Sequence, residues 1–238
     1  MMEDLRARLV STLRAPTQRA LRSLWSPTRG EYLSSAEVGS PDPAVVLQAM
    51  LGDASAELPS SLPELLAHEY SARWQIDGEA LRLLSAFVRA TKPTRMLETG
   101  VADGASTRVI LDAMNTNRSG RLDSVDISPT AGALARTSPG VQRWNFTSLP
   151  RRGRARETRR IVQSLAPLDV FLHDSDHSYP WQAFEYRTAW DALAPGGWIL
   201  SDDIDASYAF LDFARRHQRR PWILAGPTKM FGAVRKGT

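Results

Sequence analysis

The stretch MLETGVADGAST at residues 96–107 decides the fold, because it joins a short apolar run to the start of a helix through a turn with two glycines. We expect a strand over residues 95–98 and a helix over residues 105–114. Gly100 and Gly104 lack a Cβ atom, so this turn can pass close to a ligand and enter the helix without a clash. A strand that leads into a helix in this way predicts one repeat of a parallel α/β sheet.

The same alternation of short apolar runs and longer amphipathic stretches continues to the end of the chain. Further strands are expected over residues 122–127, 141–144, 169–173, 198–201, 221–225 and 230–234, and further helices over 154–165, 181–193 and 206–217. Only a Gly-Pro-Thr-Lys turn separates the last two strands, which indicates a hairpin. The pattern predicts an α/β fold of the Rossmann-like, doubly wound type, with a mostly parallel seven-stranded sheet and a C-terminal antiparallel hairpin.

The first third of the chain has a different texture. Residues 1–25 carry leucines at roughly helical spacing among arginines, which indicates a basic amphipathic helix. Residues 26–63 are rich in Pro, Gly and Ser, as in a connector with short helical pieces, and a helix over 80–91 then feeds the core. We expect residues 1–70 to form an N-terminal helical extension that serves oligomerisation, in a homodimer, or acts as a lid near Tyr70 and Trp74. Residues 71–238 would form the α/β domain.

The composition excludes several classes of protein. With 238 residues, 42% of them hydrophobic, and a net charge of +4, the chain suits one domain with a sizeable core and is not of the disordered type. It holds no cysteine, which excludes disulfides, thiolate catalysis and Cys-ligated metal sites. No apolar run approaches the roughly 20 residues that span a bilayer, and no secretory signal is visible. We therefore expect a cytoplasmic protein without a membrane partner.

Arginines gather between residues 151 and 160 and again between residues 215 and 220. Aromatic side chains are not interleaved with them in the way that nucleic-acid binding favours, and no nucleic-acid-reading motif is present. We favour solvated helix faces and expect no nucleic-acid partner. An anionic substrate or surface is the alternative that these clusters leave open.

Acidic side chains stand at the ends of almost all the central predicted strands. They are Glu98, Asp126, Asp174 and Asp176 beside His177, and the pair Asp202 and Asp203. In a doubly wound sheet, ligands bind at the carboxyl ends of the strands. A purely structural sheet has no reason to gather charge there, because each carboxylate needs a partner or water. The sequence therefore predicts a ligand site at this edge of the sheet.

The first two strand ends point to the kind of ligand. An acidic residue just before the turn, Glu98, would repel a diphosphate but suits an ammonium group, and the Gly-x-Gly-x-x-Gly pattern of dinucleotide-binding enzymes is absent. Asp126 is placed to accept hydrogen bonds from ribose hydroxyls. A nucleoside with a cationic amino-acid tail is S-adenosylmethionine, which we predict as the cofactor.

Asp174, Asp202 and Asp203 form a second constellation. Three hard oxygen ligands from neighbouring strand ends suit Mg²⁺ or another divalent cation. Such an ion would bind a substrate hydroxyl and lower its pKa. Two neighbours are candidate bases for the hydroxyl proton: His177, whose ordinary pKa near 6.5 suits neutral pH, and Asp176.

Three stretches carry a resemblance to a known family. Residues 96–107, 169–179 and 193–205 resemble class I S-adenosylmethionine-dependent methyltransferases, in particular the cation-dependent O-methyltransferases that include enzymes acting on macrolide sugars. The resemblance covers about residues 75–236, which makes residues 71–238 the methyltransferase domain. It implies cofactor contacts by Glu98, Gly100, Gly104, Ser106, Asp126, Ser148 and Asp174, and metal contacts by Asp174, Asp202 and Asp203. It also favours His177 over Asp176 as the base, with Asp174 beside it. Phe146-Thr147-Ser148 stands where the family usually has Gly-Asp-Ser.

The resemblance implies a metal-dependent O-methyltransferase of a small-molecule or saccharide acceptor. The methyl group would pass from S-adenosylmethionine to an acceptor hydroxyl that Mg²⁺ helps to deprotonate. Two alternatives stay open: a methyltransferase of another acceptor (a phenol, a catechol or a nucleic acid), and a non-catalytic protein that only binds the cofactor.

Overall fold

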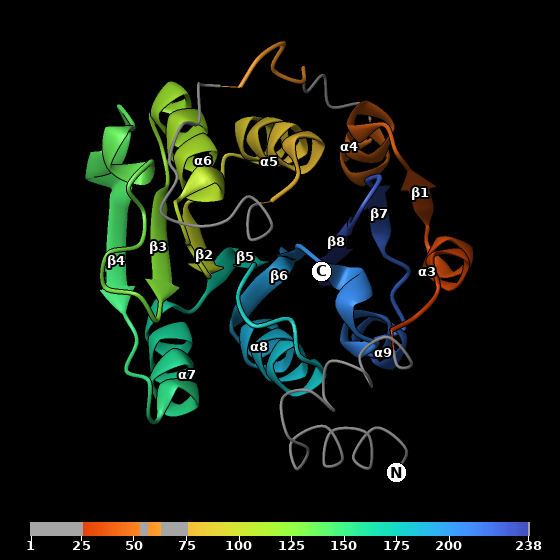
Figure 1. The fold of residues 1–238 in the computed structure, drawn as a ribbon. Coiled ribbons are helices and arrows are strands. Elements are labelled where there is room, and N and C mark those ends of the chain that lie inside the picture. Colours follow the sequence, from red (N-terminus) through yellow and green to blue (C-terminus); the bar gives the residue numbers. More distant parts are fainter. Residues whose placement is uncertain (1–25, 53–56, 63–75, 238) are drawn as a thin grey trace.

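The structure, a computed structural model, describes residues 26–52, 57–62 and 76–237. An eight-stranded sheet runs through its centre in the order β1-β7-β8-β6-β5-β2-β3-β4 (Figure 1). The strands are β1 (Val38–Ser40), β2 (Arg95–Thr99), β3 (Arg121–Asp126), β4 (Trp144–Ser148), β5 (Leu168–His173), β6 (Leu193–Ser201), β7 (Trp222–Ala225) and β8 (Met230–Arg235). Only β8 runs antiparallel to its neighbours β6 and β7, so the predicted Rossmann-like fold with a terminal hairpin is confirmed.

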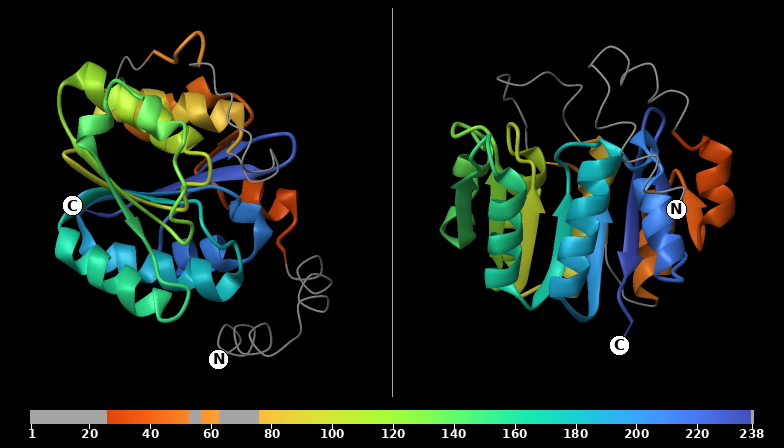
Figure 2. Two further views of the ribbon diagram at one scale, coloured as in Figure 1. Left: turned by 60° about the vertical axis from the view of Figure 1, so that its left-hand side comes forward. Right: turned by 90° about the horizontal axis from the view of Figure 1, so that it is seen from below.

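Helices cover both faces of the sheet, as the two views of Figure 2 show. One face carries α4 (Pro43–Leu51), α5 (Gly78–Thr91) and α6 (Ala105–Asn117); the other carries α7 (Arg154–Leu165), α8 (Tyr179–Ala192) and α9 (Ala209–Arg216). A short helix, α3 (Arg29–Ser35), packs at the edge near β7. None of the helices in the described residues is both long enough and apolar enough to cross a membrane.

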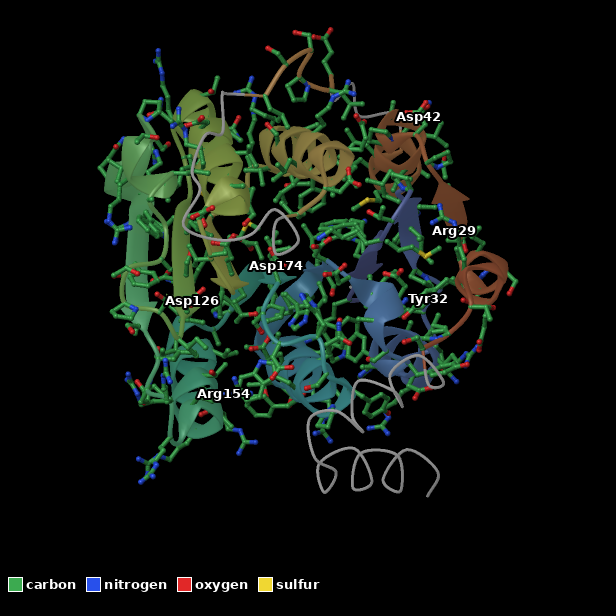
Figure 3. All side chains as sticks on the ribbon, viewed as in Figure 1. Arg29, Tyr32, Asp42, Asp126, Arg154 and Asp174 are labelled. Carbon is green, nitrogen blue, oxygen red and sulfur yellow. The ribbon has the colours of Figure 1, made fainter. Side chains whose placement is uncertain are left out.

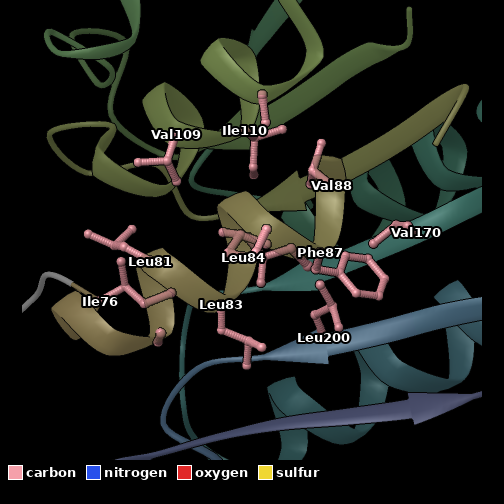
Figure 4. Close-up of a cluster of buried hydrophobic side chains, with 14 of the residues drawn as sticks. Ile76, Leu81, Leu83, Leu84, Phe87, Val88, Val109, Ile110, Val170 and Leu200 are labelled. Carbon is pink, nitrogen blue, oxygen red and sulfur yellow. The ribbon is translucent and has the colours of Figure 1, made fainter. Parts of the chain in front are cut away.

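The core forms where amphipathic helices press on the sheet. In α5 the apolar side chains recur at helical spacing, and Asp77 caps its first turn by accepting a hydrogen bond from the Glu79 amide at 2.9 Å. Figure 4 shows Leu84 and Phe87 of this helix facing the sheet. The Phe87 ring meets Trp198 of β6 edge to face, with 5.5 Å between ring centroids. This packing fixes the central strands whose ends form the site.

The strand order places a crevice between β2 and β5. From β2, the chain adds β3 and β4 on one side and returns to add β5 and β6 on the other, all parallel. The connections therefore diverge at the carboxyl ends of β2 and β5, and this is the position where doubly wound sheets bind ligands.

Several details of the predicted elements were wrong. The strand predicted over residues 198–201 begins already at residue 193, and the last helix begins at residue 209 and not at 206. The third strand begins at Trp144 and not at Val141, because residues 141–143 form a 3₁₀ turn. The sheet also has an eighth strand, β1, inside the expected connector; its three residues are too few to show a period, and pairing with β7 defines them. Tyr32 of α3 anchors this region, since its buried hydroxyl hydrogen-bonds to the carbonyl oxygens of Ile204 and Ser207.

The expected division of the chain at residue 70 stays a prediction. The N-terminal helix over residues 1–25, with the dimerisation expected through it, lies outside the described residues, as do Tyr70 and Trp74.

Candidate active site

A cavity of about 580 Å³ opens at the carboxyl ends of β2, β3 and β5, at the crevice that the strand order creates. Its volume is in the range of sites that bind small molecules and cofactors. Predicted residues from each of these strand ends line it: Gly100, Asp126, Asp174, Asp176 and His177. Figure 3 labels Asp126 and Asp174 at the ends of β3 and β5, and Arg154 at the start of α7.

The turn after β2 lies directly against the end of β5. Gly100 has φ +83°, and a Cβ atom on it would lie 1.9 Å from the carbonyl oxygen of Asp174. Only glycine fits here, for both its backbone conformation and its close approach. The turn thereby forms one wall of the cavity and Asp174 the adjoining wall.

Asp126 holds this turn and also faces the cavity. Its Oδ2 accepts hydrogen bonds from the amides of Val101 (2.8 Å) and Ala102 (3.1 Å), and its Oδ1 accepts one from Ser128 (2.8 Å). A carboxylate has about four lone-pair positions, so at least one remains for a ligand hydroxyl. The predicted contact with a ribose is therefore compatible with the geometry.

Glu98 and Ser106 lie behind the turn and do not line the cavity. The Glu98 carboxylate is fully buried and accepts hydrogen bonds from the hydroxyls of Ser106 (2.6 Å), Thr107 (2.7 Å) and Ser124 (2.8 Å). Burial raises the pKa of Glu98, against the opposing effect of these three hydrogen bonds. In this arrangement Glu98 ties β2, β3 and α6 together beneath the site.

Two further predicted cofactor residues also stand away from the cavity lining. Gly104 is the N-cap residue just before α6, and a Cβ atom on it would meet the Cα atom of Gly132 at 3.0 Å, so it makes room for a neighbouring loop. Ser148 is exposed at the end of β4, whereas the buried Leu149 that follows it lines the cavity.

The carboxylates predicted from β5 and β6 do come together. Nε2 of His177 lies 3.9 Å from Oδ1 of Asp174 and 3.4 Å from Oδ2 of Asp203. Lys229 lies in the turn just before β8, and its Nζ is 2.9 Å from Oδ2 of Asp202 and 3.7 Å from Oδ2 of Asp203. Burial raises the pKa of Asp174 well above its ordinary value, and burial together with Asp203 raises that of Asp202 to about 7. We call Asp174, Asp202 and Asp203 the acidic cluster.

The acidic cluster does not fit a divalent ion in the arrangement that it adopts. Mg²⁺ demands near-octahedral oxygen ligands at 2.0–2.1 Å, as a rule. Here the Lys229 ammonium is hydrogen-bonded to Asp202, and no group of three or more His, Asp or Glu side chains within the described residues is arranged to hold a metal. The magnesium ion expected from the sequence stays a prediction.

The two candidate bases have different surroundings. Asp176 accepts hydrogen bonds from the Ser178 amide (3.0 Å) and from Nη2 of Arg154 (2.9 Å). Burial alone would raise the pKa of Asp176, but these hydrogen bonds outweigh it and lower the pKa. A carboxylate held in its ionised form by an arginine is a weak base. His177 is the better candidate on this geometry.

Sequence reasoning missed a hydrogen-bonded network around Glu185, and Thr99, Ser175 and Glu185 of this network line the same cavity. Oε2 of Glu185, on α8, lies 2.6 Å from Nδ1 of His173 and accepts hydrogen bonds from the hydroxyls of Thr99 (2.7 Å) and Ser175 (3.0 Å). The His173 ring meets the His177 ring edge to face, with 5.4 Å between centroids. The sequence did hold one signal for this network, because Glu185 is an acidic residue on the buried, aromatic-rich side of α8. The sequence held no such signal for Lys229, which belongs to a segment that we interpreted only as a turn.

Comparisons with known proteins found a family model that matches part of the chain and solved structures with a similar fold. Residues 97–204 match a family model described as a methyltransferase domain. No protein of curated function matches the chain in sequence. Among solved structures, the O-methyltransferase TomG from Streptomyces achromogenes, involved in tomaymycin synthesis and bound to SAM, is 15% identical, with 70% of this chain and 83% of TomG covered and a TM-score of 0.57. The O-methyltransferase from Bacillus cereus in complex with SAH is 16% identical, with 90% of this chain and 100% of that chain covered and a TM-score of 0.54. At such identities the structures share the fold.

Proposed function

From the premise that residues 97–204 of this chain form a methyltransferase domain, we propose that the protein is an O-methyltransferase that uses S-adenosylmethionine to methylate a hydroxyl of a small-molecule or glycoside acceptor. The resemblance to S-adenosylmethionine-dependent methyltransferases predicted from the sequence is confirmed by this match. The acceptor class rests on the sequence resemblance to enzymes of macrolide sugars.

The observation that carries the proposal is the pairing of two kinds of group around one cavity. The Gly100 turn and Asp126 suit the nucleoside and amino-acid parts of the cofactor. On the adjoining wall, His177 and Asp174 suit a proton transfer next to the methyl group. A cavity built only to bind a nucleoside would not need a histidine beside carboxylates.

The chain's own residues can supply the proton transfer. As the acceptor oxygen attacks the methyl carbon, the bond from that carbon to the sulfonium sulfur breaks, and the cofactor leaves as neutral S-adenosylhomocysteine. The acceptor proton passes to Nε2 of His177, which becomes an imidazolium. The carboxylates of Asp203 at 3.4 Å and Asp174 at 3.9 Å favour that charged form. No step in this scheme passes through a metal ion.

Asp176 and Arg154 serve the acceptor side of the cavity in this proposal. The Arg154 guanidinium lies 4.0 Å from the centroid of the Trp181 ring while it pairs with Asp176. The guanidinium offers hydrogen-bond donors and the Asp176 carboxylate offers acceptors, which suits an acceptor that carries hydroxyl groups.

Methyl transfer from labelled S-adenosylmethionine to a panel of acceptors tests the proposal. The panel holds macrolide glycosides, free sugars, catechols and an oligonucleotide, and mass spectrometry locates the new methyl group. We expect an O-methylated glycoside or small molecule, and a loss of about 10²-fold or more in kcat for His177→Ala. His217→Ala, a histidine at the end of α9, is the matched control and should keep full activity. Transfer to nucleic acid alone, cofactor binding without any product, or a fully active His177→Ala would each contradict the proposal.

A further inference from the structure

Lys229 occupies the position among the acidic side chains at which the sequence led us to expect a cation. Its Nζ donates a hydrogen bond of 2.9 Å to Oδ2 of Asp202, whose side chain is only 1% exposed, and lies 3.7 Å from Oδ2 of Asp203. The lysine side chain itself is 16% exposed. An ammonium this well enclosed between two carboxylates is part of the site and not a solvated surface charge.

The segment that carries Lys229 is fixed from both sides. Before it, the guanidinium of Arg29 donates hydrogen bonds to the carbonyl oxygens of Ala225 and Gly226, each at 2.6 Å. After it, the amide of Met230 donates a hydrogen bond of 3.0 Å to Oδ1 of Asp205. The turn between β7 and β8 is thus anchored to α3 and to the loop after Asp203, and its position holds the lysine over the acidic cluster.

The position of Lys229 also sets the geometry of the proposed base. Asp203 is shared between the two basic groups: its Oδ2 lies 3.7 Å from Nζ of Lys229 and 3.4 Å from Nε2 of His177. Without the ammonium, the carboxylates of Asp202 and Asp203 would repel each other in a buried site. They would then move apart, take up a proton, or recruit a cation from solution.

We propose that Lys229 is the built-in cation of the acidic cluster, that it takes the place of a divalent metal ion there, and that it positions Asp203 toward His177. The metal-binding part of this inference stands on the geometry alone, and the catalytic part rests on the proposed O-methyltransferase function. In the catalytic part, the acceptor proton goes to His177, the oxygen–methyl bond forms as the methyl–sulfur bond breaks, and Lys229 stays protonated throughout. Lys229 is a positioning residue in this scheme.

Binding of Mn²⁺ to the protein, measured by electron paramagnetic resonance in the presence of S-adenosylhomocysteine, tests the metal part without any turnover. We expect wild-type protein to leave millimolar Mn²⁺ free. Lys229→Met keeps the length of the side chain but removes its charge, so we expect it to bind Mn²⁺ at least 10-fold more tightly than wild type. Adding Asp202→Asn to that variant should abolish the gain. Lys92→Met, at the end of α5 and outside the site, is the matched control and should behave like wild type. Wild-type protein that binds Mn²⁺ as tightly as Lys229→Met would overturn the inference, as would a folded Lys229→Met that gains no binding.

Turnover supplies the second test. A chelator should leave the wild-type rate unchanged within about twofold, whereas Lys229→Met should lower kcat by about 10-fold or more, with little effect on the KM for S-adenosylmethionine. Lys229→Arg, which keeps the positive charge, should recover part of the rate and still exclude Mn²⁺. If chelation abolishes wild-type activity and Mg²⁺ restores it, the inference fails while the O-methyltransferase function stands. If the protein methylates nothing, the Mn²⁺ measurements still test the metal part, because they need no turnover. If Lys229→Met does not fold, Lys229→Arg takes its place, and tight binding of Mn²⁺ by wild type would still overturn the inference.

Discussion

Replacing Gly100 with alanine adds one methyl group at the tightest point of the site, where β2 meets β5. The new Cβ atom would lie 1.9 Å from the carbonyl oxygen of Asp174 and 2.9 Å from Cα of Ser175. Both distances are far below ordinary contact, which is about 3.5–4.0 Å between carbon atoms. The atoms met are backbone atoms at the end of β5, so no side chain can swing away to make room.

Two effects add up in this variant. Alanine at φ +83° brings a backbone strain of roughly 1–2 kcal/mol. Forcing the turn away from Asp174 brings a further overpacking loss, typically 1–3 kcal/mol. We therefore expect Gly100→Ala to lower the free energy of unfolding by about 2–5 kcal/mol. Because the displaced turn also carries the amides bonded to Asp126, affinity for the cofactor should fall as well.

Gly153→Ala is the control that separates the two effects. Gly153 has φ +76°, and nothing lies within 4 Å of the position where a Cβ atom would stand. This variant should therefore lose only the stability that backbone strain costs, about 1–2 kcal/mol. Urea denaturation gives the two stabilities, and calorimetric titration with S-adenosylhomocysteine gives the two affinities. The reasoning is refuted if both variants show the same stability loss and both bind the ligand as wild type does.

Three further predictions concern groups around the site. Tyr32→Phe should lower the free energy of unfolding by about 1–3 kcal/mol in urea, because buried carbonyl groups at residues 204 and 207 lose their donor, and the half-buried Tyr208→Phe should have the smaller effect. Glu98→Gln should lower the free energy of unfolding by a similar amount, about 1–3 kcal/mol, because an NH₂ group in place of Oε2 cannot accept the hydrogen bonds from the Thr107 and Ser124 hydroxyls. A stability equal to wild type would show that these hydroxyls reorient without loss. Arg154→Met should raise the pKa of Asp176, because one of the groups that lowers it is lost. The ionised Asp176 carboxylate stabilises the fold above its unfolded pKa, and this stability is lost as the pH falls through its folded pKa. In the variant, the loss should therefore occur at a higher pH. Carboxyl NMR titration measures this shift, and an unchanged midpoint would count against it.

The central strands could be predicted from the sequence because each one is a short apolar run with a marked end. A buried parallel strand shows in the sequence as a continuous apolar run. The ends of β5 at His173 and of β6 at Ser201 could therefore be predicted from the points where these runs stop. β1 could not be found this way. Its three residues have no pattern of their own, and β7 supplies the pairing that makes them a strand.

The candidate site likewise has a part that could be predicted from the sequence and a part that could not. Its acidic rim was predictable, since strand ends of a parallel sheet meet at one edge, and the structure does bring Asp174, Asp203 and His177 together. Lys229 and Glu185 reach the site from a hairpin and from a helix face, and only the packing of those elements decides where their side chains go. At the end of β4, the predicted cofactor residue and the residue that lines the cavity differ by one position: Ser148 is exposed, and its neighbour Leu149 lines the cavity.

The most direct test of this account is a crystal structure of the protein with S-adenosylhomocysteine bound. The account predicts the ligand in the cavity at the ends of β2, β3 and β5, with a ribose hydroxyl within hydrogen-bond distance of Asp126 and the sulfur on the side of His177. A ligand bound elsewhere on the molecule, or a cavity that stays empty at saturating concentration, would contradict it.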